Sequence, residues 1–221
     1  MRAPRLLLGA FAIAAVADLG FLLAGSDTGH TVAKPLLMPL LAGYAALRGA
    51  PRLLVAALLF GWGGDTLLLS DADPAFLAGM ASFAAGHVCY LALFRTVGTP
   101  RARAGLLLPC YAVVLLATVA LLWPDLPADL RVPVAVYSTL LTAMAYAAGA
   151  RLGLVAGLGG ALFMASDTLI ATGIADRPQL PGPDFWIMLT YAAAQFLLVR
   201  GTLDERRAPT AAYREVRSTT P

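Results

Sequence analysis

Eight apolar stretches dominate this sequence and constrain its fold more than any other feature. They cover residues 5–25, 29–48, 52–70, 75–95, 104–123, 131–150, 152–174 and 184–203, with short segments rich in Pro, Gly and Asp between them. Most approach the roughly 20 residues that a helix needs to cross a bilayer. A water-soluble chain with 59% hydrophobic and 13% charged residues could not bury that much apolar surface. The sequence therefore predicts an all-α integral membrane protein with eight transmembrane helices in one bundle.

The basic residues predict how this bundle lies in the membrane. Thirteen arginines fall at one end of the predicted helices, and only Lys34, Arg131 and Arg177 fall at the other. Cytoplasmic loops carry the excess of cations, so we expect both termini inside, in a bacterial-type inner or cell membrane. Residues 1–203 then form the membrane domain, and residues 204–221 form a short polar tail. Because the cations lie in short loops and this tail, no nucleic-acid partner is expected.

The second stretch is short for a membrane-spanning helix. From Pro35 to Leu47 it offers about 20 Å of apolar helix, against a hydrocarbon core of about 30 Å. Either the helix begins near Gly29 and carries Lys34 inside it, or Pro35 breaks the helix and leaves Lys34 at its mouth. Both alternatives place an ammonium group near the outer end of the bundle.

Two aspartates lie inside apolar stretches in matching contexts. Phe60-Gly-Trp-Gly-Gly-Asp65-Thr-Leu occurs in the third stretch, and Phe163-Met-Ala-Ser-Asp167-Thr-Leu occurs in the seventh. An ionisable group there costs roughly 3 kcal/mol on insertion scales, so it predicts a functional site. At 1.5 Å per residue, both carboxyls lie about 10 Å below the outer boundary. The repetition also suggests two four-helix halves in parallel orientation.

Other polar residues are expected at nearly the same depth. They are Asp18, Lys34, His87, Tyr90, Tyr137 and Gln195. A structural role is open for each: Asp18 can pair with Lys34, and the others can link helices by hydrogen bonds. One lysine and one histidine cannot neutralise three buried aspartates, so at least one carboxyl is expected to be protonated near neutral pH. Such a carboxyl can serve as a general acid.

Several other chemistries fit these residues poorly. Two widely spaced histidines do not predict a metal site, and no Gly-x-Ser-x-Gly elbow is present in the sequence. The sequence lacks the Gly-x-Gly-Asp motif of intramembrane proteases at Asp65, because Trp62 occupies the position of its first glycine. A proton-coupled carrier or lipid transporter that uses the aspartates as a relay stays open. A structural membrane protein is the third alternative.

A set of short motifs in chain order resembles a known family. They are Lys34-Pro with Met38, Gly64-Asp-Thr-Leu-Leu, Phe76-x-x-Gly-x-x-x-Phe83-x-x-x-His87-x-x-Tyr90, Tyr137 with Met144 and Ala147, and Gly160-Ala-Leu-Phe-x-x-Ser-Asp167. This order resembles that of the YhhN-like membrane proteins, whose characterised members are lysoplasmalogenases. The resemblance covers the second to eighth stretches, and the two aspartate motifs are its most specific part.

The resemblance implies an eight-helix enzyme that hydrolyses the vinyl ether bond of lysoplasmalogens. The products would be a fatty aldehyde and glycerophospho-ethanolamine or -choline. Carried over by motif, Asp65 and Asp167 are the expected catalytic pair, with Lys34, His87 and Tyr137 in the same pocket. A vinyl ether is cleaved by protonation of carbon followed by addition of water, which suits paired carboxyls as in glycoside hydrolysis. A lysophospholipid substrate and the bilayer are the expected partners, and no metal or organic cofactor is expected.

Overall fold

The computed structural model of the chain describes residues 2–70, 72–102 and 104–218, and the regular elements among these residues are all helices. Side chains are described as far as residue 207. The elements are α1 (Arg2–Leu23), α2 (Asp27–Leu47), α3 (Arg52–Leu67), α4 (Asp73–Val97), α5 (Ala104–Leu122), α6 (Ala128–Ala147), the π-helical turn η1 (Ala148–Leu152), α7 (Leu154–Ile174) and α8 (Pro183–Ser218). Each of the eight predicted helices is present. Their ends differ from the predicted ones by at most three residues, except at the end of α8.

The helix α2 resolves the alternatives for the second stretch in favour of the longer helix. It is continuous from Asp27 and passes through Pro35 and Pro39 without a break. Its start is capped by the Ser26 hydroxyl, which accepts a hydrogen bond from the amide of Gly29. Lys34 therefore lies two turns inside the helix. At the other end of the chain, α8 continues as a helix beyond Asp204 into the polar residues.

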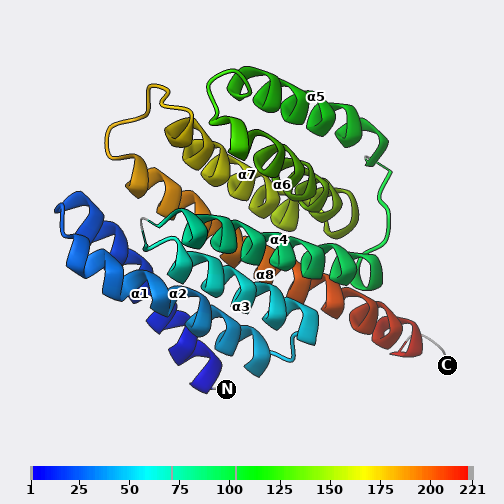
Figure 1. The fold of residues 1–221 in the computed structure, drawn as a ribbon. Helices are drawn as coiled ribbons and strands as arrows, with labels where there is room; N and C mark the ends of the chain where they lie inside the picture. The colour runs from blue at the N-terminus through cyan, green and yellow to red at the C-terminus, as the bar shows by residue number, and fades with distance from the viewer. Residues whose placement is uncertain (1, 71, 103, 219–221) are drawn as a thin grey trace.

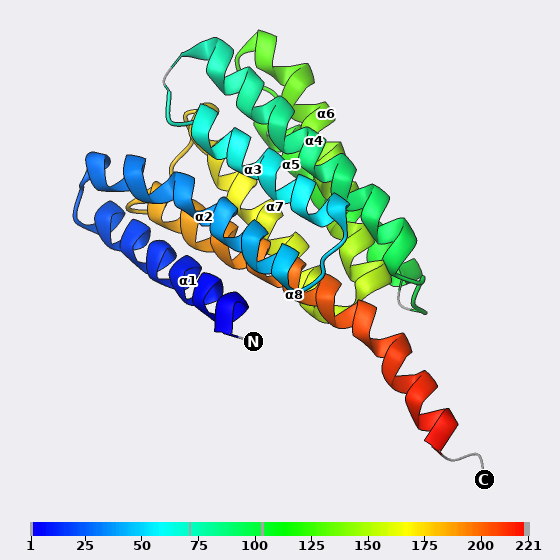
Figure 2. The ribbon, with the colours of Figure 1, turned by 90° about the horizontal axis from the view of Figure 1, so that it is seen from below.

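The helices form a bundle in which α5 is peripheral (Figure 1). Antiparallel neighbours pack in the pairs α1–α2, α3–α4 and α7–α8, while α6 bridges α4 and α7. The helix α8 also contacts α1, α2 and α4, and so lies near the centre of the bundle (Figure 2). In contrast, Leu122 is the one buried residue described for α5. The helices α3 and α7 run in the same direction (Figures 1 and 2). Asp65 and Asp167 lie in the C-terminal halves of these helices, so both lie toward the same end of the bundle.

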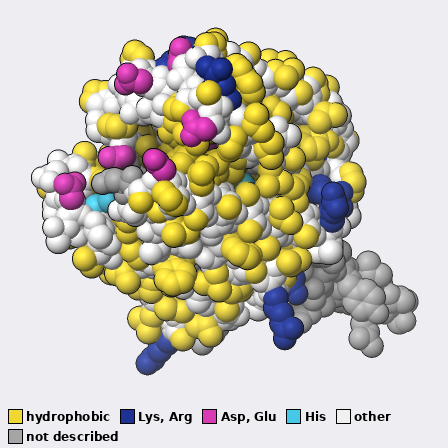
Figure 3. Space-filling view, in the orientation of Figure 1, with side chains coloured by type: hydrophobic (Ala, Val, Ile, Leu, Met, Phe, Trp, Pro, Cys, Tyr) yellow, Lys and Arg dark blue, Asp and Glu magenta, His cyan; other side chains and the backbone are white. Residues whose placement is uncertain are grey.

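The surface agrees with a protein that lies in a membrane. Six helical segments are long and apolar enough to cross a bilayer, namely α1, α4, α5, α6 with η1, α7, and α8 as far as Arg207. Large apolar side chains such as Ile13, Leu106 and Leu116 are more than two-thirds exposed. Figure 3 shows acidic side chains gathered at the end with the α1–α2 and α3–α4 turns, with arginines mainly toward the opposite end. The chain is thus a multi-pass, all-α integral membrane protein.

Candidate active site

Asp65 lies in the last turn of α3 and is only 3% exposed. Oδ2 of its carboxyl accepts a hydrogen bond of 2.8 Å from the hydroxyl of Tyr191 on α8. The glycines of the motif make this contact possible, because α3 must approach its neighbours closely. A Cβ on Gly61 would lie 3.0 Å from the Tyr191 hydroxyl, and one on Gly64 would lie 2.4 Å from the ring of Phe83. The small residues before Asp65 therefore set the position of its carboxyl.

The Tyr191 hydroxyl belongs to a longer chain of hydrogen bonds in the core. Tyr90 on α4 donates to Oε1 of Gln195 at 2.6 Å, and Nε2 of Gln195 donates to the Tyr191 hydroxyl at 3.3 Å. Tyr191 in turn donates to Asp65, so this chain links α4, α8 and α3. All four side chains are at most 3% exposed. A buried network whose members satisfy one another fixes the orientation of its terminal carboxyl.

Asp167 lies in the middle of α7 and is held by a second chain of hydrogen bonds. Its Oδ2 accepts a hydrogen bond from the hydroxyl of Tyr137 on α6. Nε2 of His87 on α4 lies 3.2 Å from the same hydroxyl. The ring of Phe163 stands between the two chains, 4.9 Å from the ring of His87 and 5.4 Å from that of Tyr191. Each carboxyl thus has its own tyrosine partner on another helix, and the ring of Phe163 lies between the two hydrogen-bonded chains.

Charges on neighbouring helices lie close to this pair. Lys34, Asp167 and Asp18 are all near enough to interact electrostatically with Asp65. The Lys34 side chain is half-buried on α2, which packs against α3. The cluster therefore contains one ammonium group and carboxyls from α1, α3 and α7 at one level of the bundle.

Asp18 pairs with a different residue from the one expected. Its Oδ1 lies 2.8 Å from Nδ1 of His30, in the first turn of α2. The alternative of an Asp18–Lys34 pair is wrong, because His30 faces Asp18 across the α1–α2 interface. The second carboxyl oxygen of Asp18 and Nδ1 of His87 have no hydrogen-bond partner within the described part of the chain. This leaves Lys34 without an ion-pair partner among the described residues.

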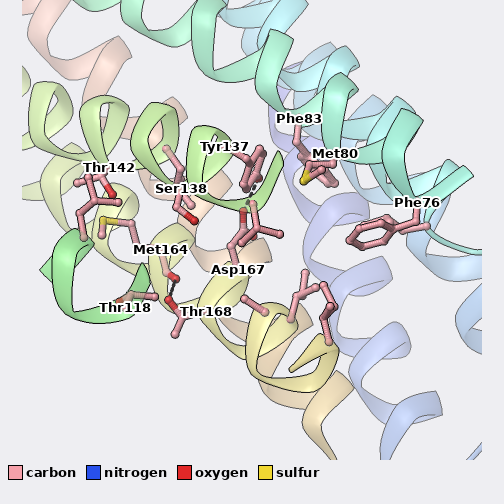
Figure 4. Close-up of a pocket in the computed structure, with 17 residues that line it drawn as sticks. Phe76, Met80, Phe83, Thr118, Tyr137, Ser138, Thr142, Met164, Asp167 and Thr168 are labelled. Carbon is pink, nitrogen blue, oxygen red and sulfur yellow. Dashed lines mark hydrogen bonds between the residues drawn. The ribbon is translucent and has the colours of Figure 1, made fainter. Parts of the chain in front are cut away.

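An apolar pocket of about 730 Å³ opens beside Asp167, and part of this volume is continuous with the surroundings (Figure 4). The described residues that line it are Leu68, Phe76, Met80, Phe83, Leu115, Thr118, Val134, Tyr137, Ser138, Leu141, Thr142, Met164, Asp167, Thr168, Ile170, Ala171 and Ile174. Asp167 is the one charged residue in this set, and the Tyr137 hydroxyl lies beside it. The lining, which is apolar apart from a few polar groups, is typical of a site for a largely apolar ligand.

The structure brings most of the predicted site residues into one cluster. Asp65 and Asp167 lie at its centre; His87, Tyr90, Tyr137 and Gln195 are joined to them by hydrogen bonds, and Lys34 lies within electrostatic reach. Sequence reasoning missed Tyr191. The signal was present, because Tyr191 lies one turn before Gln195, which was already a candidate site residue. The depth of Tyr191 along its helix, one turn from that of Gln195, could therefore have suggested it.

Together, the fold and the site define a multi-pass helical membrane protein with two neighbouring intramembrane carboxyls, one of which lines an apolar pocket. Residues 29–202 match the YhhN family, so the chain belongs to the YhhN family. It is 32% identical to a lysoplasmalogenase of Mycobacterium tuberculosis, over 94% of this chain and 88% of that protein. It is also 37% identical to the human lysoplasmalogenase TMEM86B, over 73% of this chain and 66% of that protein. No solved structure matches the chain.

Proposed function

We propose that this protein is a lysoplasmalogenase, a membrane hydrolase that cleaves the vinyl ether bond of a lysoplasmalogen by means of Asp65 and Asp167. Relatives with that name align with most of the chain. The observation that carries the mechanism is the convergence of the two carboxyls, from α3 and α7, next to an apolar pocket. A single-chain lipid has an apolar tail and a polar head, and the site offers an apolar pocket and a lysine.

The chemistry of a vinyl ether requires what the two carboxyls can supply. Protonation of the carbon remote from the oxygen creates an oxocarbenium ion, and water then adds to give a hemiacetal that collapses to the aldehyde. One carboxylic acid must deliver the proton, and one carboxylate must stabilise the cation and activate water. Tyr137 and Tyr191 hold the two groups in place, as effective acid–base catalysis requires. Lys34 is suited to binding the lipid phosphate as a point charge.

We also infer that all eight helices lie in the membrane, with both termini in the cytoplasm. The helix α3 has only 16 residues, about 24 Å of helix, and α2 begins with polar residues. The helix α2 nevertheless packs against α1 and α8, and α3 packs against α4, and all three of these neighbours are candidate membrane spans. In the site, each carboxyl of one half of the chain is linked to a side chain of the other half, which supports two related four-helix halves. Asp65 is bound by a residue of α8, while Asp167 is linked through Tyr137 to His87 of α4.

The function is tested by mass spectrometry of lysoplasmalogen incubated with the purified protein in detergent. We expect release of fatty aldehyde by the wild type, and a loss of at least about a hundredfold in Asp65→Asn and Asp167→Asn. Asp129→Asn is the matched control, because Asp129 is exposed at the start of α6. Near-normal turnover in both site variants, as folded proteins, would overturn the proposal. No aldehyde, together with movement of lipid driven by a pH gradient in liposomes, would favour a proton-coupled carrier instead.

A further inference from the structure

The two carboxyls differ in their relation to the apolar pocket. Asp167 lines it, together with Tyr137, while Asp65 is not among the described residues that line it. Asp65 instead faces the chain of polar groups on α8, on the side of the bundle where Lys34 lies. The helix α2, which carries Lys34, packs mainly on α1 and α3, with a smaller contact on α8. The cluster therefore has an apolar side at Asp167 and a charged side at Asp65.

The apolar pocket leads toward the lipid-facing surface of the bundle. Thr118, Met164 and Thr168 line it and also line a shallow groove between α5 and α7. The groove continues past Tyr111 and Ala161, along the outside of α7. The helix α5 closes this side only loosely, because Leu122 is its one buried residue among those described. An apolar chain that lies beside Asp167 can thus leave the protein between α5 and α7 and enter the hydrocarbon core.

This asymmetry, taken with the proposed function, indicates how the bound substrate is oriented in the site. We propose that the alkenyl chain lies in the pocket and passes out between α5 and α7, with the glycerophosphate toward Lys34. Asp167 is then the carboxyl that protonates the vinyl ether, and Asp65 is the one that activates water. These roles follow from the order of atoms in the substrate. The carbon that receives the proton is bonded to the tail, and the carbon that receives water is bonded to the ether oxygen on the head-group side.

The steps balance with these assignments. The Asp167 carboxyl gives its proton to the tail-side carbon, whose double-bond electrons form the new C–H bond and leave an oxocarbenium ion. Water adds to the other carbon as Asp65 takes one of its protons, which gives the hemiacetal. In the collapse, the hemiacetal hydroxyl returns its proton to Asp167, and protonated Asp65 donates to the glycerol oxygen as the C–O bond breaks. One water is consumed, and both carboxyls recover their starting states.

The role of each carboxyl is tested by direct binding, which does not depend on turnover. The probe is a lysolipid with a protonated secondary amine in place of the vinyl ether oxygen, measured by titration calorimetry in detergent. The ammonium mimics the oxocarbenium ion, so Asp65→Asn should weaken binding by about tenfold or more, because a charge-assisted contact is lost. Asp167→Asn should change it by less than about threefold. The reverse order, or equal losses, would overturn the assignment.

The position of the tail is tested by chain-length selectivity. Met164→Trp narrows the passage between the pocket and the groove, so turnover of a long-chain lysoplasmalogen should fall at least about tenfold more than that of a short-chain one. Thr118→Phe fills the same passage from α5 and should act alike if Met164→Trp does not fold. Leu158→Trp is the control, because Leu158 is 51% exposed on α7 outside the groove. Equal losses for both chain lengths would overturn the placement. A wild type that releases no aldehyde would instead overturn the proposed function itself.

Discussion

The hydroxyl of Tyr191 donates a hydrogen bond of 2.8 Å to Oδ2 of Asp65, across 126 residues of sequence. The contact joins α8 to the end of α3 and fixes one oxygen of a carboxyl that is almost completely buried. Gln195 supports the same hydroxyl from one turn further along α8. The proposed chemistry depends on the direction in which the Asp65 carboxyl points, so Tyr191 is a positioning residue of the site.

The first prediction concerns this positioning. In Tyr191→Phe, the carboxyl of Asp65 loses the partner that orients it while the ring keeps its packing. We expect kcat for aldehyde release to fall about tenfold or more, with KM changed by less than about threefold. Tyr44→Phe is the control, because the hydroxyl of Tyr44 accepts a hydrogen bond from Arg48 at the C-terminal end of α2 and has no part in the network around Asp65. A variant with wild-type kcat would show that Tyr191 has no part in positioning Asp65.

The second prediction concerns the pair of His30 and Asp18. In His30→Leu, a completely buried carboxyl loses its one hydrogen-bond partner among the described residues, at a cost of about 1–3 kcal/mol. Thermal unfolding in detergent should show a clear fall in midpoint. The double variant Asp18→Leu/His30→Leu removes both polar groups and should recover part of the loss. If the double variant loses more unfolding free energy than the two single variants lose together, the pair does not act as described.

The third prediction concerns Arg151, in the π-helical turn that follows α6. Its guanidinium donates to the carbonyls of Phe94, Arg95 and Gly98, at 2.8, 3.2 and 2.8 Å, and so satisfies the C-terminal end of α4. Arg151→Ala should lower the free energy of unfolding by at least about 2 kcal/mol. Arg151→Lys should restore only part of it, because one ammonium cannot reproduce the planar set of donors.

Arg95→Ala is the matched control for Arg151. The Arg95 side chain is exposed, and its backbone carbonyl, which accepts from Arg151, is unchanged by the substitution. Unfolding midpoints in the same detergent compare the three variants directly. An equal fall for Arg95→Ala and Arg151→Ala would show that loss of a surface charge, and not loss of the α4 cap, explains the effect.

The fourth prediction concerns the contact of α6 with α7. A Cβ on Gly160 would lie 2.7 Å from the Cα of Ala145. This backbone atom of α6 cannot move aside by a change of rotamer, as a side chain could. Gly160→Ala should therefore separate the two helices and destabilise the protein by about 1–3 kcal/mol. Because Tyr137 and Asp167 lie on these helices, aldehyde release should fall as well. Gly9→Ala in α1 meets open space and should be neutral or slightly stabilising, by up to about 1 kcal/mol.

The fold was predictable from sequence to the extent that each helix can be placed along its own axis. Hydropathy located the predicted helix 75–95 within two residues of α4 at each end, and the predicted helix 104–123 within one residue of α5. Depth along a helix also follows from residue number, so Asp65, Asp167, Tyr137 and Gln195 were expected at a common level. Hydropathy does not specify rotation about the axis or the order of neighbours in the bundle. For that reason His30 was not recognised as the partner of Asp18.

The sequence by itself therefore determined the class of this protein, its eight helices and the level at which its polar residues lie. These properties follow from the free energy of apolar helices in a bilayer, which depends on composition and length. Only the tertiary structure decided that Tyr191 holds Asp65, that α5 lies at the edge, and that Asp167 faces the apolar pocket while Asp65 does not. Such relations depend on which helix faces pack together, and packing joins residues more than a hundred positions apart.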